Sequence, residues 1–102
     1  MTLPPEKSKP VHYAITWLPN GWKNYLYWQE SDQENDRKIP VGVNQMIRGA
    51  LRNPITGIGK PEPLRNNLKG WWSRRITEAH RLIFKVENES LLIMKCWFHY
   101  DD

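Results

Sequence analysis

Three side chains in the second half of the chain have the types that acid–base chemistry on a phosphate ester requires: Glu62, Arg81 and His99. Glu62 lies between two prolines, which would hold a general base on a stiff loop. Histidine has an unperturbed pKa near neutrality, so His99 suits a general acid. An arginine at position 81 can clamp a phosphate and neutralise its developing charge. Such a set would let a ribose 2′-OH attack the adjacent phosphate while the leaving 5′-oxygen is protonated.

Each of these residues also has an interpretation without chemistry. Glu62 is compatible with a loop carboxylate in water, His99 with a histidine at a strand edge, and Arg81 with a solvated strand cation. His80 neighbours Arg81 on the opposite strand face and is interpreted as structural, and His12 as an edge residue. The histidines lack metal-binding spacing, and there is neither a Gly-rich phosphate loop nor a nucleophile elbow. The sequence therefore predicts no metal and no cofactor.

Charge is distributed unevenly along the chain. The net charge of +4 favours an anionic partner, and residues 28–36 carry four acids and no base. Cations interleaved with aromatic rings suit nucleic acid, and the chain has six tryptophans, which are equally compatible with a core. The basic surface is predicted from seven residues of the second half: Lys60, Arg65, Lys69, Arg74, Arg75, Arg81 and Lys85.

The length of 102 residues predicts one domain, over residues 11–102, preceded by a flexible tail over residues 1–10. No apolar run is long enough to span a membrane, and the N-terminus lacks the apolar core of a signal peptide. The single cysteine, Cys96, is expected to be a buried small hydrophobe. Together these features favour a cytoplasmic protein.

The local patterns predict the order β-α-α-β-β-β. A strand is expected over Val11–Leu18, then a helix over Trp22–Glu30 with Asn20 as its N-cap. A second helix has Pro40 in its first turn and stops at Asn53-Pro54, and a loop runs from Thr56 to Asn67. Three strands follow, over residues 70–76, 79–86 and 91–100. The predicted fold is α+β, with both helices on one face of a three- or four-stranded antiparallel sheet.

The last two strands pose a register problem. Leu92, Met94, Cys96 and Phe98 form a purely apolar set in the last strand, so this set is expected to meet the helices. In the preceding strand, the apolar set is Leu82, Phe84 and Val86. If Val86 paired directly with Leu91, Arg81 would share a face with Cys96. Placing Arg81, Lys85, Lys95 and His99 on one open basic face therefore requires an odd-length connection or a β-bulge.

Several motifs resemble the YoeB family of toxin–antitoxin systems, which belongs to the RelE-like mRNA interferases. The motifs are YLYWQE from Tyr25, GKPEPL from Gly59, WSRRIT from Trp72, E-x-H-R-L from Glu78 and the pair His99-Tyr100. The resemblance implies a ribosome-dependent endoribonuclease silenced by a YefM-like antitoxin, with operator DNA contacted only through the antitoxin and a homodimer as one oligomeric state.

Residue by residue, the resemblance implies roles for specific positions. Glu62 matches the general base, His99 the general acid, Arg81 the arginine that stabilises the phosphate, and Tyr100 a tyrosine that orients the RNA and the acid. The expected RNA contacts are basic positions: Lys60, Arg65, Lys69, Arg74 and Arg75.

Two departures from the family keep a second function open. The chain continues past His99-Tyr100 with Asp101 and Asp102, whose carboxylates would repel phosphate. Extra residues fall between Asp32 and Asn53, where the family's helix is more basic. An mRNA interferase is favoured because its three catalytic residues are present. The alternatives are a toxin-fold module that acts through antitoxin binding and operon autoregulation, and a nuclease that needs no ribosome.

Overall fold

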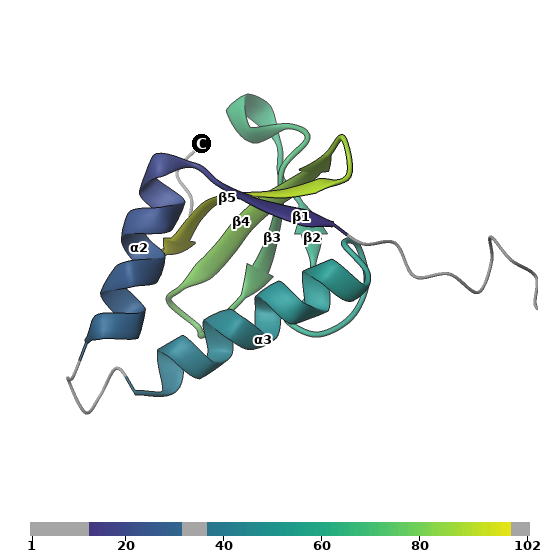
Figure 1. The fold of residues 1–102 in the computed structure, drawn as a ribbon. Helices are drawn as coiled ribbons and strands as arrows, with labels where there is room; N and C mark the ends of the chain where they lie inside the picture. The colour runs from purple at the N-terminus through teal and green to yellow at the C-terminus, as the bar shows by residue number, and fades with distance from the viewer. Residues whose placement is uncertain (1–12, 32–36, 99–102) are drawn as a thin grey trace, which may run out of the picture.

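The computed structural model describes residues 13–31 and 37–98, and these form two helices packed on one face of a mixed five-stranded sheet (Figure 1). The predicted α+β class is confirmed. The elements are β1 (Ala14–Trp17), α2 (Pro19–Glu30), α3 (Lys38–Arg52), β2 (Glu62–Pro63), a 3-10 turn η2 (Asn66–Leu68), β3 (Trp72–Arg75), β4 (Arg81–Glu87) and β5 (Ser90–Trp97).

The sheet differs from the expectation in its strand number and in the pairing of β1. Its strand order is β1-β5-β4-β3-β2, and β1 runs parallel to β5 while the other pairs are antiparallel. Parallel pairing is possible because a long connection, through both helices and strands β2 to β4, separates β1 from β5 in the chain. The extra strand is β2, whose two residues pair at the sheet edge, where proline is tolerated.

Helix α2 begins at Pro19, three residues before the expected start, and Leu18 is the N-cap in place of Asn20. Proline at the first helical position has the right φ and lacks an N–H that would be unsatisfied there. Gly21 is buried against β5, and a Cβ at this position would lie 2.4 Å from the carbonyl oxygen of Ile93. Only glycine therefore permits this close approach of helix and strand.

Side chains of α2 replace β1 along the end of β5. Pairing with β1 reaches only to Ile93. Beyond it, the backbone N–H of Cys96 donates to Asn24 Oδ1 at 3.1 Å, and the indole of Trp28 donates to the Cys96 carbonyl oxygen at 2.6 Å. These bonds satisfy backbone groups that would otherwise be unpaired in the interior.

The predicted register irregularity is confirmed as a bulge between β4 and β5. Val86 does pair with Leu91, but Ile83 pairs with Lys95 while Phe84 pairs with Ile93, so Met94 is the extra residue. Arg81, Lys85 and Lys95 consequently share one face, because β4 alternates without interruption and the bulge corrects β5.

The bulge also changes which residues of β5 enter the core. Leu91 and Ile93 are fully buried together with Cys96, whereas the expected Leu92 and Met94 are only partly buried and Phe98 is 51% exposed. The assignment was right for Cys96 and wrong for the other three. The buried core comprises Trp28, Ile39, Val43, Met46, Ile47, Ala50, Leu82, Phe84, Leu91, Ile93 and Cys96.

Candidate active site

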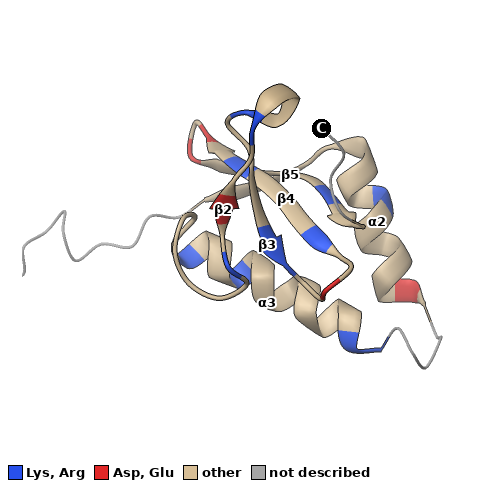
Figure 2. Cartoon of the chain, turned by 180° about the vertical axis from the view of Figure 1, so that it is seen from behind, with Lys and Arg blue, Asp and Glu red and all other residues tan. Residues whose placement is uncertain are grey.

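The sheet face opposite the helices carries a row of residues from four strands. Glu62 pairs with Ser73, Ser73 with Ile83, and Ile83 with Lys95. Figure 2 views this face, with an acidic residue on β2 and basic residues on β3, β4 and β5. Neighbouring strands lie about 4.8 Å apart, so the row spans roughly 15 Å between the backbones of Glu62 and Lys95.

Two arginines face each other in the next row. Arg75 of β3 pairs directly with Arg81 of β4, and Arg75 is two positions along from Ser73, the partner of Glu62. Diagonal neighbours in a sheet are about 7–8 Å apart, so the backbone of Glu62 lies close to that of Arg75, and Arg81 is one strand further away. Like charges placed directly opposite repel each other. The only acid recorded near Arg75 among the described residues is the exposed Glu78, at a long 3.9 Å. This pair of arginines would be stabilised by an anion bound between them.

Arg81 has a structural role in addition. Its side chain is nearly buried, and Nη1 donates to the carbonyl oxygens of Thr77 at 2.7 Å, Glu78 at 2.8 Å and His80 at 3.2 Å. The hydroxyl of Thr77 accepts from the N–H groups of Ala79 and His80 in the same turn. The guanidinium group therefore fixes the turn between β3 and β4, which sets the pairing of Arg81 with Arg75.

The loop that carries Glu62 is fixed at both of its ends. The Arg75 N–H donates to the Gly59 carbonyl oxygen at 2.6 Å, and the Leu64 N–H donates to that of Trp71 at 2.9 Å. Gly59 has φ +84, and a Cβ there would lie 2.4 Å from the sulfur of Met46. Glu62 itself is exposed. The carboxylate is thus presented to solvent from a backbone that cannot easily move away.

The expected RNA-contact residues divide into two groups. Lys60, Arg65 and Lys69 are exposed in the segment around β2 and η2, and Arg75 is on the open face. Arg74, in contrast, is fully buried on the helix side of the sheet. The expectation that it meets RNA directly does not fit this position, because alternate residues of a strand point to opposite faces.

The guanidinium of Arg74 instead holds the loop after α3. It donates to the carbonyl oxygens of Asn53 at 2.5 Å, Thr56 at 2.6 Å and Ile58 at 3.0 Å, and lies 5.7 Å from the ring centre of Phe84. Burial lowers the pKa of Arg74 below its ordinary value, because desolvation penalises the charged form.

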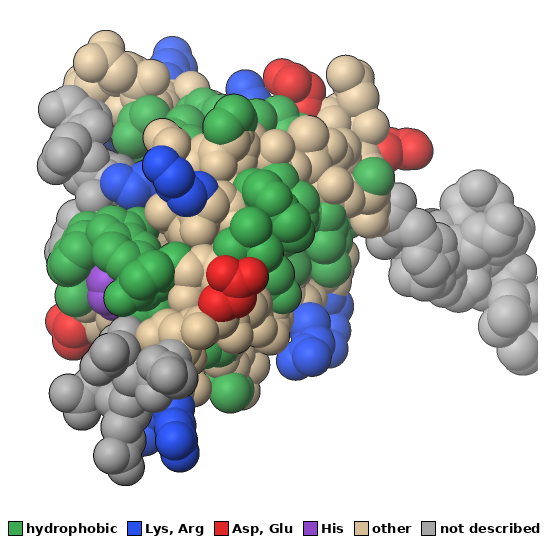
Figure 3. Space-filling view, turned by 60° about the vertical axis from the view of Figure 1, so that its left-hand side comes forward, with side chains coloured by type: hydrophobic (Ala, Val, Ile, Leu, Met, Phe, Trp, Pro, Cys, Tyr) green, Lys and Arg blue, Asp and Glu red, His purple; other side chains and the backbone are tan. Residues whose placement is uncertain are grey.

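The predicted general acid and its neighbour, His99 and Tyr100, lie outside the described residues, as do His12, Asp101 and Asp102. The described chain ends at Phe98, beside the aromatic group around His80. The His80 ring lies 4.9 Å from Trp28, 5.6 Å from Trp97 and 4.6 Å from Phe98. Figure 3 shows histidine atoms bordered by hydrophobic side chains on this face of the molecule. His80 is thus buried among the aromatic rings of Trp28, Trp97 and Phe98.

One feature of the site was not foreseen from the sequence: the direct opposition of Arg75 and Arg81. The signal was the length of the segment between them, Ile76 to His80, since a hairpin pairs the residues that flank its turn. The pairing of Arg75 with Arg81 follows only if all of residues 76–80 form the turn, and the sequence alone did not show this.

Within residues 13–31 and 37–98, no group of three or more histidine, cysteine or acidic side chains is arranged to hold a metal ion. In the same part of the chain, no helix has the length and hydrophobicity that crossing a membrane requires.

Sequence comparison finds a matching family and several similar proteins. Residues 17–100 match the family described as the YoeB-like toxin of bacterial type II toxin–antitoxin systems. Toxin YoeB of Escherichia coli strain K12 is 50% identical over 86 residues, which cover 84% of this chain and 98% of that protein. Toxin YoeB of Streptomyces coelicolor is 43% identical over 86 residues, with the same coverage.

Solved structures agree with this assignment. A YoeB/ParE toxin from Agrobacterium tumefaciens superposes with a TM-score of 0.76 at 37% identity, covering 85% of this chain and 99% of that chain. The toxin in a YoeB-YefM complex from Staphylococcus aureus gives 0.75 at 36% identity, covering 87% and 99%. YafQ from E. coli, at 16% identity and a TM-score of 0.66, shares the fold. The chain belongs to the YoeB-like toxins of bacterial type II toxin–antitoxin systems.

Proposed function

We propose that this toxin is an endoribonuclease that cleaves mRNA on the ribosome and so inhibits translation. The observation that carries the proposal is the placement of Glu62 diagonally from Arg75, which faces Arg81 on the open face of the sheet. A carboxylate beside two cations has the composition needed to deprotonate a 2′-OH and to stabilise the phosphate that it attacks.

The proposed roles follow from these positions and from the sequence motifs. Glu62 takes the proton of the ribose 2′-OH, and the resulting oxygen attacks the neighbouring phosphate. Arg75 and the part of Arg81 that does not hold the turn neutralise the charge that develops on the phosphate. We assign protonation of the leaving 5′-oxygen to His99 and orientation of the RNA to Tyr100, on the sequence resemblance.

Exposed basic side chains around the loop would bind the RNA strand on either side of the cleaved bond. Lys60, Arg65 and Lys69 are all exposed in the segment that carries Glu62. Lys85 lies 4.8 Å from the ring centre of Trp71 and 3.4 Å from Glu87, so it is already engaged by its neighbours. Contacts between these basic side chains and RNA phosphates would add affinity without recognising the nucleotide sequence.

The partner we propose is a YefM-like antitoxin. A similar toxin from S. aureus is found in a YoeB-YefM complex, and another structure is a YoeB dimer from the same organism. The free toxin would cleave mRNA, and the toxin in the complex would be inactive. Association of two copies of this chain is the corresponding proposal for its oligomeric state.

A second function has one observation in its favour. Nη1 of Arg81 is occupied by three carbonyl oxygens, so the side chain also serves the fold alone. On this alternative the chain acts through antitoxin binding and operon autoregulation, and cleavage would be weak or absent.

The test compares Glu62→Gln with Glu87→Gln, a matched change at another exposed acid of the sheet. Both chains are added to a cell-free translation reaction, and cuts in the mRNA are mapped by primer extension. Glu62→Gln should slow cleavage by about 10²–10⁴-fold, the usual contribution of a general base. Glu87→Gln should cut like the parent. Full cleavage by Glu62→Gln would remove Glu62 as the base, and no cleavage by the parent chain would favour the alternative. Naked mRNA serves as the control for ribosome dependence.

A further inference from the structure

A second basic site lies on the helix side of the sheet, where α3 meets the loop that follows it. The surface is hollowed there into an open pocket of about 690 Å³. Its lining includes Arg48, Gly49 and Arg52 from α3, and Thr56, Gly57 and Ile58 from the loop. None of the lining residues belongs to the proposed catalytic set.

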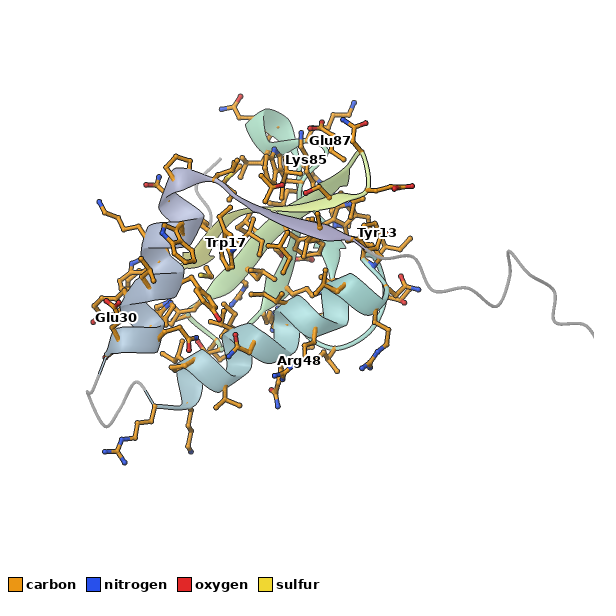
Figure 4. All side chains as sticks on the ribbon, viewed as in Figure 1. Tyr13, Trp17, Glu30, Arg48, Lys85 and Glu87 are labelled. Carbon is orange, nitrogen blue, oxygen red and sulfur yellow. The ribbon has the colours of Figure 1, made fainter. Side chains whose placement is uncertain are left out.

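Two exposed arginines stand on one side of this pocket. Arg48 and Arg52 are one helical turn apart, and like charges at this spacing repel each other. In the described part of the chain, neither guanidinium group has a recorded ion pair or hydrogen bond. Arg52 in the last turn of α3 is favoured by the helix dipole, but that effect fades before the position of Arg48. Figure 4 shows Arg48 directed away from the sheet.

A third cation lies directly beneath the pocket. A Cβ on Gly49 would lie 2.8 Å from Nη1 of Arg74, and one on Gly57 would lie 3.4 Å from the same atom. Two glycines of the lining thus leave only backbone between the buried guanidinium group and the pocket. Neither of the ion pairs recorded among the described residues involves Arg74.

No acid offsets these charges nearby in the sequence. Residues 37–61 contain five bases and neither aspartate nor glutamate. The occupant of the pocket should therefore be anionic, since two exposed arginines in the lining, with the buried Arg74 beneath them and no carboxylate in the region, create a positive potential.

The rest of the lining favours an acidic peptide over a nucleic acid as the anionic ligand. Ile58 in the pocket is 53% exposed, and Ile55, three residues earlier, is 55% exposed. No aromatic ring lines the pocket, so unpaired bases would find nothing to stack on. An exposed isoleucine beside arginines matches a peptide that carries both a carboxylate and an apolar side chain.

We propose that this pocket binds an acidic segment of the antitoxin, with carboxylates against Arg48 and Arg52 and an apolar side chain against Ile58. The inference rests on the partner named under the proposed function, and not on the cleavage chemistry. It gives the antitoxin a point of attachment on the helix side, separate from the face that carries Glu62.

The test measures the dissociation constant of the toxin with a YefM-like antitoxin that co-purifies with it, by titration calorimetry. The double variant Arg48→Gln/Arg52→Gln should raise the dissociation constant by about tenfold or more, and Ile58→Ser by several-fold. The matched control, Arg37→Gln/Lys38→Gln, removes the same charge from exposed positions at the other end of α3 and should stay within about twofold. Thermal unfolding midpoints would confirm that all variants fold.

Each outcome decides the proposal. An unchanged dissociation constant in the Arg48/Arg52 variant would overturn it, and so would an equal loss in the Arg37/Lys38 control. If the constant is unchanged but mRNA cleavage by free toxin falls, the pocket binds RNA instead of peptide. Cleavage that is unaffected in every variant, together with a weakened complex, is the expected result. The affinity is measured without any cleavage, so failure of the nuclease proposal would be seen separately.

Discussion

Arg74 and Arg75 show how far the function of a residue depends on strand alternation. They are consecutive in β3 and chemically identical, yet one is fully buried behind the sheet and the other is on the open face. The buried one holds three carbonyl oxygens of the loop after α3. The other lies beside the carboxylate of the candidate site. Of these two consecutive arginines, Arg74 therefore supports the fold, and Arg75 is the one that we propose for the ligand.

Arg74→Lys tests the structural half of this division. A lysine cannot reproduce the planar set of donors, so we expect the free energy of unfolding to fall by about 2–4 kcal/mol. Urea denaturation measures this loss, and proteolysis within residues 53–61 should become faster in the native state. Arg75→Lys is the control and should change stability by less than about 0.5 kcal/mol. Equal losses in the two variants would contradict the assignment.

Cys96 gives a prediction about pH. Burial raises the pKa of its thiol from 9.0 to about 12. Below about pH 8 the thiol is protonated in both the folded and the unfolded chain, so it contributes no pH dependence there. Between pH 9 and 12 only the unfolded chain releases the proton, so stability falls with rising pH, by at most about 1.4 kcal/mol per unit.

The measurement is the difference in unfolding free energy between the parent and Cys96→Ala. The advantage of the parent should be constant up to about pH 8 and should shrink above pH 9. A difference that stays constant to pH 11 would show that the thiol is not desolvated as its burial indicates. A thiol reagent at neutral pH should likewise fail to modify the folded parent chain.

At the level of the elements, the sequence predicted the bulge but not all of its consequences. The demand that Arg81 and Lys95 share a face was enough to require an irregularity between β4 and β5. The position of the bulge could not be predicted, because residues 91–94 are all apolar and any of them could face the core. The faces of Leu91 and Ile93 are set by their pairing with β1, a long-range contact that local pattern does not contain.

The candidate site was predictable to a similar degree. The type and the motif context of Glu62 and Arg81 indicated phosphate chemistry, and the structure places Glu62 diagonally from Arg75, which pairs with Arg81. The burial of Arg74 followed from register, which depends on the length of the turn after β3. The strand β2 was missed because two residues flanked by proline give no periodic signal.

The turn between β4 and β5 offers a test at this scale. Asn88 and Glu89 both have positive φ, of 52 and 60. Two-residue hairpin turns of this type favour Asn followed by Gly, and glutamate is strained where glycine is not. Glu89→Gly should therefore raise the free energy of unfolding by about 0.5–1 kcal/mol, measured by urea denaturation.

The control for this turn is Asn88→Gly. Asparagine already tolerates the left-handed region, so the substitution should give a smaller gain or none. If Asn88→Gly stabilises more than Glu89→Gly, the strain does not lie at Glu89.

For the whole molecule, the sheet separates two positively charged surfaces. One is the open face with Arg75 and Arg81, and the other is the pocket at α3 with Arg48 and Arg52. Net charge alone would attract RNA to both. The proposals above assign RNA to the first surface and an acidic peptide to the second, so the two surfaces should differ in how salt affects RNA binding.

The salt dependence of RNA affinity can separate them. Binding of a labelled single-stranded RNA is measured for Glu62→Gln, which keeps the proposed contacts but should not cleave. The logarithm of the association constant should fall linearly with the logarithm of salt concentration, because each phosphate contact releases counterions. Removing one contact, by Arg65→Gln or Arg75→Gln in that background, should reduce the slope by about 0.7. Arg48→Gln removes the same charge on the helix side and should leave the slope unchanged. A reduced slope for Arg48→Gln and not for Arg75→Gln would place RNA on the helix side, and would remove both the assignment of the open face to RNA and that of the pocket to a peptide.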